Sequence, residues 1–258
     1  MKIVNVTRTI LCSDLRTLGI TSGDTVFFHS SLKSIGHVEG GPDAVLDAFL
    51  DVIGPEGTLS LPALCLYDWD GLTSEQIERE WDVAARPTYT GLIPETFRLR
   101  RGVARSNNPT HSVTAFGKHA DTIACEHRAA AGAEWAAGRP KWASRGAFGS
   151  ATPWQKLYEL DAKYLLIGVG FDRCTILHHV QALYLEARLR DTGERAPWPD
   201  FNFNQFGDRL ERSGIVRKGT LGASTTRLMS TRNLVDTAVD VLASDGPERY
   251  RTPSPEVG

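Results

Sequence analysis

The chain has 258 residues, 41% of them hydrophobic and 23% charged, which is enough to bury a sizeable core at the upper end of one domain's usual size. A formal charge of -2 and a pI near 6.4 give no global positive field, so we expect neither nucleic acid nor a membrane surface as a partner. The four cysteines are scattered and form no paired motif, so we expect reduced thiols. We find no secretion leader and no stretch of about 18 apolar residues, and we therefore expect a cytoplasmic protein.

The first recognisable unit is a strand, a glycine-rich loop, a helix and a second strand. Apolar residues predict buried strands over residues 25–28 and 57–66. Between them lie a loop over residues 29–41 and an apolar stripe at helical spacing that begins after Pro42 and ends at Gly54. The alternation of such short strands with helices is typical of an α/β fold.

The loop of this unit has the chemistry of an anion site. It carries Ser30, Ser31, Ser34 and Lys33, and it leads into the amino end of a helix, where free N–H groups and the helix dipole favour negative charge. A pyrophosphate would suit such a loop. An ordinary strand-to-helix connection is the other interpretation, and the absence of G-K-[ST] excludes a Walker A loop.

The middle of the chain, residues 68–154, shows few regular periods, and we expect long loops there that carry function. Four arginines lie in the short run over residues 98–105, either as phosphate contacts or as a solvated face. Aromatic and acidic residues near Tyr67 and Asp68 suit a polycationic, sugar-like ligand, and they equally suit a wet surface loop.

A second unit follows, with a strand over residues 164–167, an exit loop over 168–175 and a helix that ends near Arg190. The exit loop begins G-x-G, but Arg173 stands where a dinucleotide fingerprint needs its third glycine. We therefore do not expect NAD binding.

The end of the chain carries one more helix and a tail. An apolar stripe predicts the helix over residues 230–244, with Ser230 or Thr231 as its N-cap. The tail over residues 251–258 is rich in Pro and Ser, so we expect it to be poorly ordered.

His178 and His179 open the helix of the second unit. The positive end of the helix dipole disfavours a charged imidazole in the first turn, so such a histidine stays neutral and can accept a proton near pH 7. Adjacent helical residues point about 100° apart, so at most one of the two faces a given site. The chemical interpretation is a general base, and the structural one is a histidine that caps or packs the helix.

Two other kinds of site are not supported by the pattern. No His and Cys residues have the spacing of a metal site, so we expect no metal. Ser30 or Ser31 could pair with His178 as a nucleophile, but the chain lacks the G-x-S-x-G elbow of a serine hydrolase.

Five separated strings make the chain resemble the aminoglycoside 3-N-acetyltransferase family over nearly its whole length. Their order and spacing are also those of the family. The strings are HSSLKSIGHVEGGPDAVLDAFLDVIGPEGTL (29–59), PTYTGLIPETFR (87–98), RSNNPTHSVTAFG (105–117), LYELDAKYLLIGVGFDRCTILHH (157–179) and KGTLGASTTRLMSTRNLVDTA (218–238).

The resemblance implies one α/β domain over residues 1–250, with a central mixed sheet flanked by helices and a flexible tail over 251–258. It implies acetyl-CoA as co-substrate, the 3-amino group of an aminoglycoside as acceptor, and antibiotic resistance as the result. We expect a monomer or a homodimer. His178 matches the family's catalytic histidine, and Asp172 would orient a group of the site or cap the helix.

The resemblance also implies the residues that bind the two substrates. The expected contacts to acetyl-CoA are Ser30, Ser31, Leu32, Lys33, Ser34, Val38, Arg105, Ser106, Thr110 and Ser112. The expected contacts to the acceptor are His29, Tyr67, Asp68 and Gln181.

Two positions depart from the family pattern. Asn108 stands where the family usually has a histidine before proline, and Gln181 stands where it commonly has an acid three residues after the catalytic histidine. The second change bears on the strength of the base or on a contact to a cationic acceptor. Two alternatives therefore stay open: an enzyme that acetylates another amine of secondary metabolism, and a catalytically silent protein that binds CoA or aminoglycoside.

Overall fold

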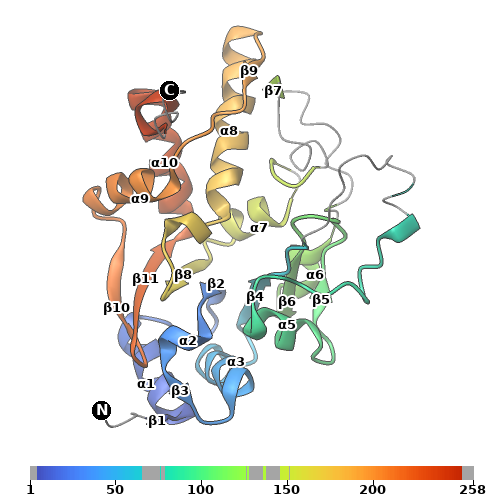
Figure 1. Cartoon of the computed structure of the whole chain (residues 1–258), viewed down its shortest axis with the longest axis vertical. Helices are drawn as coiled ribbons and strands as arrows, with labels where there is room; N and C mark the ends of the chain where they lie inside the picture. Colours follow the sequence, from blue (N-terminus) through green and yellow to red (C-terminus); the bar gives the residue numbers. More distant parts are fainter. Residues whose placement is uncertain are drawn as a thin grey trace, which may run out of the picture.

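The computed structural model describes residues 5–65, 76, 79–125, 127, 136–137, 146–150 and 152–251. Its centre is a mixed sheet of seven strands in the order β10-β11-β8-β2-β4-β6-β5 (Figure 1). The three central strands β8, β2 and β4 are parallel to one another. On one side β11 is antiparallel to β8 and β10 to β11, and on the other side β6 is antiparallel to β4 and β5 to β6. The strands are β2 (Thr25–Ser30), β4 (Thr58–Pro62), β5 (Ala104–Arg105), β6 (Val113–Gly117), β8 (Lys163–Ile167), β10 (Arg217–Leu221) and β11 (Ser224–Ser230).

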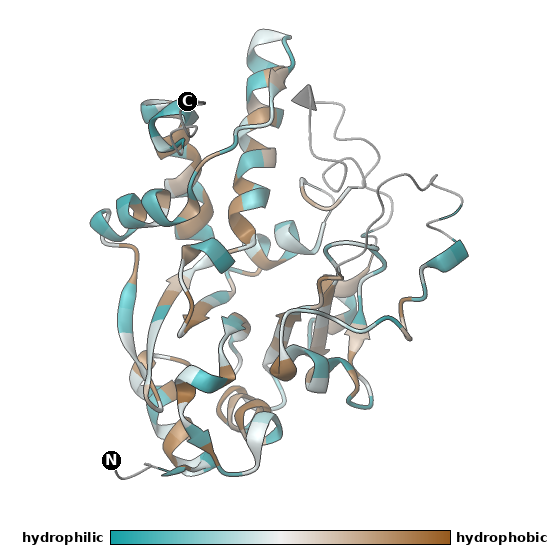
Figure 2. Cartoon of the chain, in the orientation of Figure 1, coloured by the Kyte–Doolittle hydropathy of each residue, from teal (hydrophilic) through white to brown (hydrophobic). Residues whose placement is uncertain are grey.

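Helices cover both faces of this sheet, as the sequence predicts. Phe27 of β2 faces one hydrophobic core, and its neighbours Val26 and Phe28 face the other, so the strand is apolar on both sides. Figure 2 shows hydrophobic segments on the central strands and on α3 beside them. One face is covered by α1 (Arg8–Leu18), α3 (Gly41–Ile53) and α5 (Leu92–Arg98), and the other by α6 (Ala120–Ala124), α7 (Pro153–Glu159), α8 (Ile176–Thr192), α9 (Phe203–Arg212) and α10 (Thr231–Asp245).

Several short elements lie outside these layers. They are the parallel pair β1 (Asn5–Val6) and β3 (His37–Val38), the parallel pair β7 (Ala136–Ala137) and β9 (Ala196–Pro197), the helix α2 (Leu32–Ile35), and the 3-10 turns η2 (Phe171–Arg173) and η3 (Pro247–Tyr250). Among the described residues, no helix is both long and apolar enough to cross a membrane.

The first predicted unit is confirmed, with one correction. Helix α3 begins beside Pro42 and stops at Gly54, as expected. The connection after β2, however, is not a plain loop, because it holds α2 and β3. The carbonyl oxygen of Ser31 accepts hydrogen bonds from the backbone N–H and the hydroxyl of Ser34, which closes this short helical turn.

The middle of the chain is more regular than expected. The described part of residues 68–154 contains α5, β5, β6, α6, β7 and the start of α7, with loops over residues 81–91 and 106–112, so the prediction of long loops is confirmed only in part. Each of these elements has at most seven residues, which is too short to display a clear period.

The last helix begins as predicted. The Ser230 hydroxyl accepts a hydrogen bond from the backbone N–H of Asn233, so Ser230 rather than Thr231 is the N-cap of α10. Most of the predicted tail, residues 252–258, lies outside the described residues.

Candidate active site

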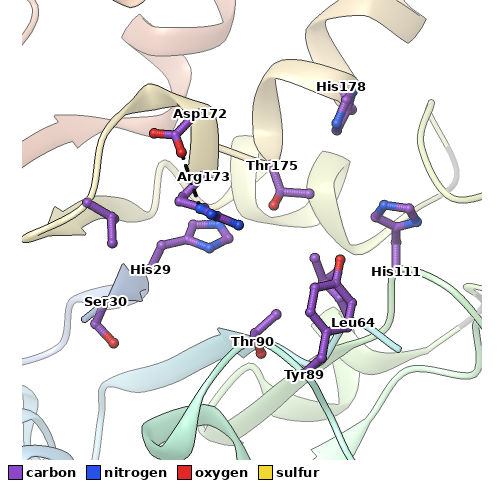
Figure 3. A pocket seen from close by; sticks show the side chains of 11 residues that line it. His29, Ser30, Leu64, Tyr89, Thr90, His111, Asp172, Arg173, Thr175 and His178 are labelled. Carbon is purple, nitrogen blue, oxygen red and sulfur yellow. Dashed lines mark ion pairs between the residues drawn. The ribbon is translucent and has the colours of Figure 1, made fainter. Parts of the chain in front are cut away.

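A cavity of about 320 Å³ opens where the three parallel strands end (Figure 3). Ser30 is the last residue of β2, Leu64 follows β4, and Val169 follows β8. The carboxyl ends of parallel strands are where α/β folds usually bind ligands. The cavity is lined by His29, Ser30, Leu64, Tyr89, Thr90, His111, Val169, Asp172, Arg173, Thr175 and His178.

His178 reaches the cavity from the first turn of α8, as predicted. Its backbone N–H donates to the carbonyl oxygen of Thr175, at the start of the helix. Burial lowers the pKa of His178 to about 4, against the hydrogen bond that its ring makes to Gln181 and the charge of Asp200, which both raise it. The imidazole is therefore neutral at pH 7, the protonation state that a general base requires.

Gln181, one turn further along α8, determines which nitrogen of His178 carries the proton. The amide nitrogen of Gln181 donates to the carbonyl oxygen of Pro199 at 2.5 Å, so its Oε1 atom faces His178 and lies 2.7 Å from Nδ1. Because an amide oxygen only accepts, Nδ1 must be the protonated nitrogen. The lone pair of the neutral ring is then on Nε2.

Aromatic rings surround His178. The ring of Phe203 lies 4.7 Å from it, that of Phe148 5.3 Å and that of His111 6.3 Å, each measured between ring centroids. The two phenylalanine rings limit the access of water to the imidazole, which explains the direction of its pKa shift. His179 points elsewhere, is fully buried, and accepts a hydrogen bond at Nδ1 from the backbone of Gly149.

His111 is a cavity residue that sequence reasoning missed. It lies between β5 and β6, and its Nδ1 is 2.9 Å from the hydroxyl of Thr110. Burial, followed by the neighbouring His178 and His127, holds its pKa well below the usual value. Leu64, Tyr89 and Thr90 were missed as well, although Tyr89 and Thr90 belong to the string over residues 87–98 that contributes to the family resemblance.

His29 and Ser30 place two polar atoms at the end of β2 without partners. Neither Nε2 of His29 nor the hydroxyl oxygen of Ser30 has a hydrogen-bond partner among the described residues, and both atoms are buried. Burial, reinforced by the charge of Arg173, lowers the pKa of His29 to about 3, so the ring is neutral. A buried polar group without a partner costs about 1–3 kcal/mol. A polar ligand in the cavity would remove that cost.

Asp172 and Arg173 supply the formal charges of the described cavity lining. Nε of Arg173 lies 3.2 Å from Oδ2 of Asp172, and both side chains are about half exposed or more. The backbone N–H of Asp172 donates to Oδ1 of Asn204 in α9, which fixes the turn that carries the pair.

The first group of predicted CoA contacts lies next to the cavity. Ser30 lines it, and Ser31, Leu32, Lys33 and Ser34 follow directly in α2 and its N-cap. Lys33 is exposed, and the backbone N–H of Ser31 donates to the carbonyl oxygen of Ile167. Val38, the second residue of β3, is buried and packs against apolar neighbours in the core.

The second group of predicted CoA contacts makes its hydrogen bonds to other residues of the protein. All five N–H directions of Arg105 are taken, by Ser112, Cys65 and the carbonyl oxygens of Ala63, Val83 and Arg86. The sequence predicted a phosphate contact here, whereas the structure gives this guanidinium an internal hydrogen-bonding role.

Ser106, Thr110 and Ser112 are similarly buried and bonded within the chain. The Ser106 hydroxyl accepts from the backbone of Val113 and lies 2.7 Å from Nδ1 of His127. Thr110 and Ser112 bond to Asn108 and Ala63. In the described part of the chain these residues support the cavity wall rather than line it.

The remaining predicted residues divide into two sets. Tyr67 and Asp68 lie outside the described residues. Gln181 is 1% exposed and bonded to His178 and Pro199, so it stands behind the histidine and not on the cavity surface. Among the described residues, no group of His, Cys, Asp and Glu side chains could hold a metal ion.

Residues 27–243 match the family model of aminoglycoside 3-N-acetyltransferases. Aminoglycoside N(3)-acetyltransferase VII of Streptomyces paromomycinus is 30% identical, over 91% of this chain and 90% of that protein. The prophage-derived aminoglycoside N(3')-acetyltransferase-like protein YokD of Bacillus subtilis is also 30% identical, over 90% of both chains.

Solved structures show the same fold. AAC-IIIb, solved as a binary complex with CoASH, has a TM-score of 0.77 and 25% identity over 98% of this chain and all of that chain. The apoenzyme of aminoglycoside acetyltransferase AAC(3)-IVa also has a TM-score of 0.77, with 26% identity over 98% of this chain and 94% of that one. A variant of the latter has been solved in complex with a gentamicin, at a TM-score of 0.74.

Proposed function

This chain belongs to the aminoglycoside 3-N-acetyltransferase family, and we propose that it transfers the acetyl group of acetyl-CoA to the 3-amino group of an aminoglycoside, conferring resistance. The observation that carries the proposal is the arrangement at His178, whose Nδ1 is bonded to Gln181 and whose Nε2 has the lone pair. CoA in the AAC-IIIb complex and gentamicin in the AAC(3)-IVa complex support the two substrates.

The transfer is direct. His178 takes a proton from the acceptor amine as the nitrogen attacks the thioester carbonyl carbon. The carbon–sulfur bond then breaks, and the proton passes from His178 to the sulfur, so that CoA leaves as a thiol. An amine that keeps its proton has no lone pair for the attack, so the base is the main chemical requirement. Holding both substrates in one cavity supplies the entropic part of the acceleration.

The unpartnered atoms at the end of β2 fit the acetyl donor. The hydroxyl of Ser30 and Nε2 of His29 would gain hydrogen bonds from a ligand there, and α2 follows immediately. Ser31, Leu32, Lys33 and Ser34 would bind the CoA portion, with Lys33 as an exposed cation for its phosphates. Thr175 lines the same cavity and could donate to the oxyanion that develops in the transition state.

The proposal is tested by measuring free CoA thiol with a colorimetric reagent, using acetyl-CoA and a panel of aminoglycosides and simple amines. We expect thiol release with aminoglycosides, and mass spectrometry of the product should give a single acetyl group on the 3-amino position. Release with other amines alone would contradict the acceptor. Tight CoA binding without release for any acceptor would indicate a silent binding protein.

A further inference from the structure

The ion pair in the cavity wall brings a positively charged side chain, Arg173, into a site that is proposed to bind polycations. Arg173 lines the same cavity as His178, Tyr89 and His29, and it is the positively charged member of the described lining. An aminoglycoside carries several ammonium groups, so a fixed cation in its binding site would repel it. The position of Arg173 therefore needs an explanation that the acetyl transfer itself does not give.

We propose that Arg173 is a specificity-determining residue: its guanidinium occupies, beside Asp172, the place of an ammonium group of the acceptor, and a cationic acceptor must displace it to bind. The inference rests on the proposed aminoglycoside acceptor.

The first support is the contrast between an aspartate on an anchored turn and a displaceable cation. The turn that carries Asp172 is held by Asn204 through the Asp172 backbone, and by Phe171, which is 3% exposed and packs against Gly207. The Arg173 side chain is 67% exposed, and among the described residues its guanidinium is bonded to Asp172 alone. The backbone at Asp172 therefore keeps its position if the arginine turns away, and the carboxylate stays within reach of a new cation.

The second support is the reach of the arginine's charge inside the cavity. The charge of Arg173 adds to burial in lowering the pKa of His29, and it opposes burial in its effect on the pKa of Tyr89. These two residues come from different elements of the lining, and Figure 3 shows Arg173 close to His29 and on the side of the cavity facing Tyr89. Arg173 thus occupies part of the space that an acceptor would enter.

The third support is the small cost of the exchange. An exposed ion pair contributes little, because water screens it and two long side chains must be ordered. An ammonium group of the acceptor can replace the guanidinium at Asp172 with a similar ion pair. A neutral ligand neither displaces the guanidinium nor is repelled by it, so Arg173 lowers the affinity for acceptors with several amino groups and leaves that for neutral ligands unchanged.

The experiment compares binding of sisomicin by calorimetry to the wild type, Arg173→Gln, Arg173→Lys and Asp172→Asn. We expect Arg173→Gln to bind about threefold to tenfold more tightly, because it removes the competing ion pair and the repulsion. Arg173→Lys should bind like the wild type, and Asp172→Asn more weakly. The gain in Arg173→Gln should shrink at high salt and be absent with a neutral sugar.

The chain offers a matched control. Arg190 and Asp191 are also a neighbouring Arg and Asp pair, at 3.3 Å and with similar exposure, but they lie at the far end of α8, away from the cavity lining. Arg190→Gln should leave sisomicin binding unchanged.

Three results would overturn the inference. The first is unchanged or weaker sisomicin binding in Arg173→Gln, and the second is no measurable sisomicin binding in the wild type or in Arg173→Gln. The third is a loss of acetyl-CoA affinity in Arg173→Gln without a gain for sisomicin, which would make Arg173 a phosphate contact. Failure of the proposed function is read separately, from CoA thiol release in the same samples. Tighter binding without acetyl transfer would refute the proposed reaction and keep the inference.

Discussion

Oε1 of Gln181 lies 2.7 Å from Nδ1 of His178, while the amide nitrogen of the same glutamine donates to the carbonyl oxygen of Pro199. The substitution of a glutamine for an acid therefore acts on the histidine and not on the acceptor directly. The glutamine fixes the tautomer that leaves Nε2 able to accept a proton, but it supplies no negative charge to raise the low pKa of His178.

Gln181→Glu should shift the pH dependence of the reaction. A carboxylate beside Nδ1 stabilises the imidazolium and raises the pKa of His178 from about 4. The acidic limb of kcat/KM, along which the base becomes protonated, should then move to higher pH. A pH–rate profile with acetyl-CoA and an aminoglycoside measures this, and Gln181→Leu, which has neither charge nor acceptor, should lose turnover without the upward shift. An unmoved acidic limb in Gln181→Glu would refute the contact.

His178→Ala should reduce kcat by about 10² to 10⁴, the usual contribution of a general base. Acetyl-CoA binding, measured by calorimetry, should change little, because the residues proposed to hold CoA lie on β2 and α2. His119→Ala is the control, since His119 precedes α6 and is not in the described cavity lining. Near wild-type turnover in His178→Ala would remove the histidine from its role.

Arg105→Met should destabilise the fold by about 3 kcal/mol or more, because it leaves the partly buried carbonyl oxygens of Val83 and Arg86 without this donor. Urea unfolding measures the loss. Arg101→Met is the matched control, since Arg101 belongs to the same arginine run and is exposed. If Arg105 binds a phosphate of CoA instead, the variant will keep its stability and show a raised KM for acetyl-CoA.

The parts of the site that could be predicted from sequence are those that depend on local order. His178 follows a strand and a turn, so its place in the first turn of α8 and its separation from His179 follow from helix geometry alone. His111 reaches the same cavity from a connection more than 60 positions earlier in the chain, and only the packing of β6 in the sheet brings it there. No periodicity reports such a contact.

The arginines of the run over residues 98–105 lie in different environments. Arg98 pairs with Glu95, Arg100 with Asp43, and Arg105 is enclosed by backbone carbonyl oxygens. In the sequence these three arginines belong to one basic run. Both interpretations of that run, as phosphate contacts or as a solvated face, assume that the side chains are exposed. Their different environments depend on α5 and β5, elements too short to show a period.

The stability of the protein should fall as the pH is lowered from about 6.5 to about 4. Burial lowers the pKa of His29 and His179 to about 3 and of His127 and His178 to about 4, and holds that of His111 far below normal. In this range the unfolded chain binds protons that the folded protein does not, so each such histidine costs about 1.4 kcal/mol per pH unit.

Urea unfolding at pH 7.5, 6.5 and 5.5 tests this dependence. His179→Leu removes one titrating group from the core, so its stability should depend less steeply on pH than that of the wild type. Equal wild-type stability at pH 7.5 and 5.5 would show that these rings are not held neutral.

Gly207→Ala should destabilise the protein by about 1–3 kcal/mol, although Gly→Ala within a helix normally stabilises it. A Cβ at Gly207 in α9 would lie 2.2 Å from the ring of Phe171, so the turn that carries Asp172 must move. Such a displacement should lower kcat/KM by about tenfold or more. Asp208→Ala, on the exposed face of the same helix, is the control and should keep both properties. A Gly207→Ala variant with unchanged kcat/KM would mean that the position of this turn does not matter for the reaction.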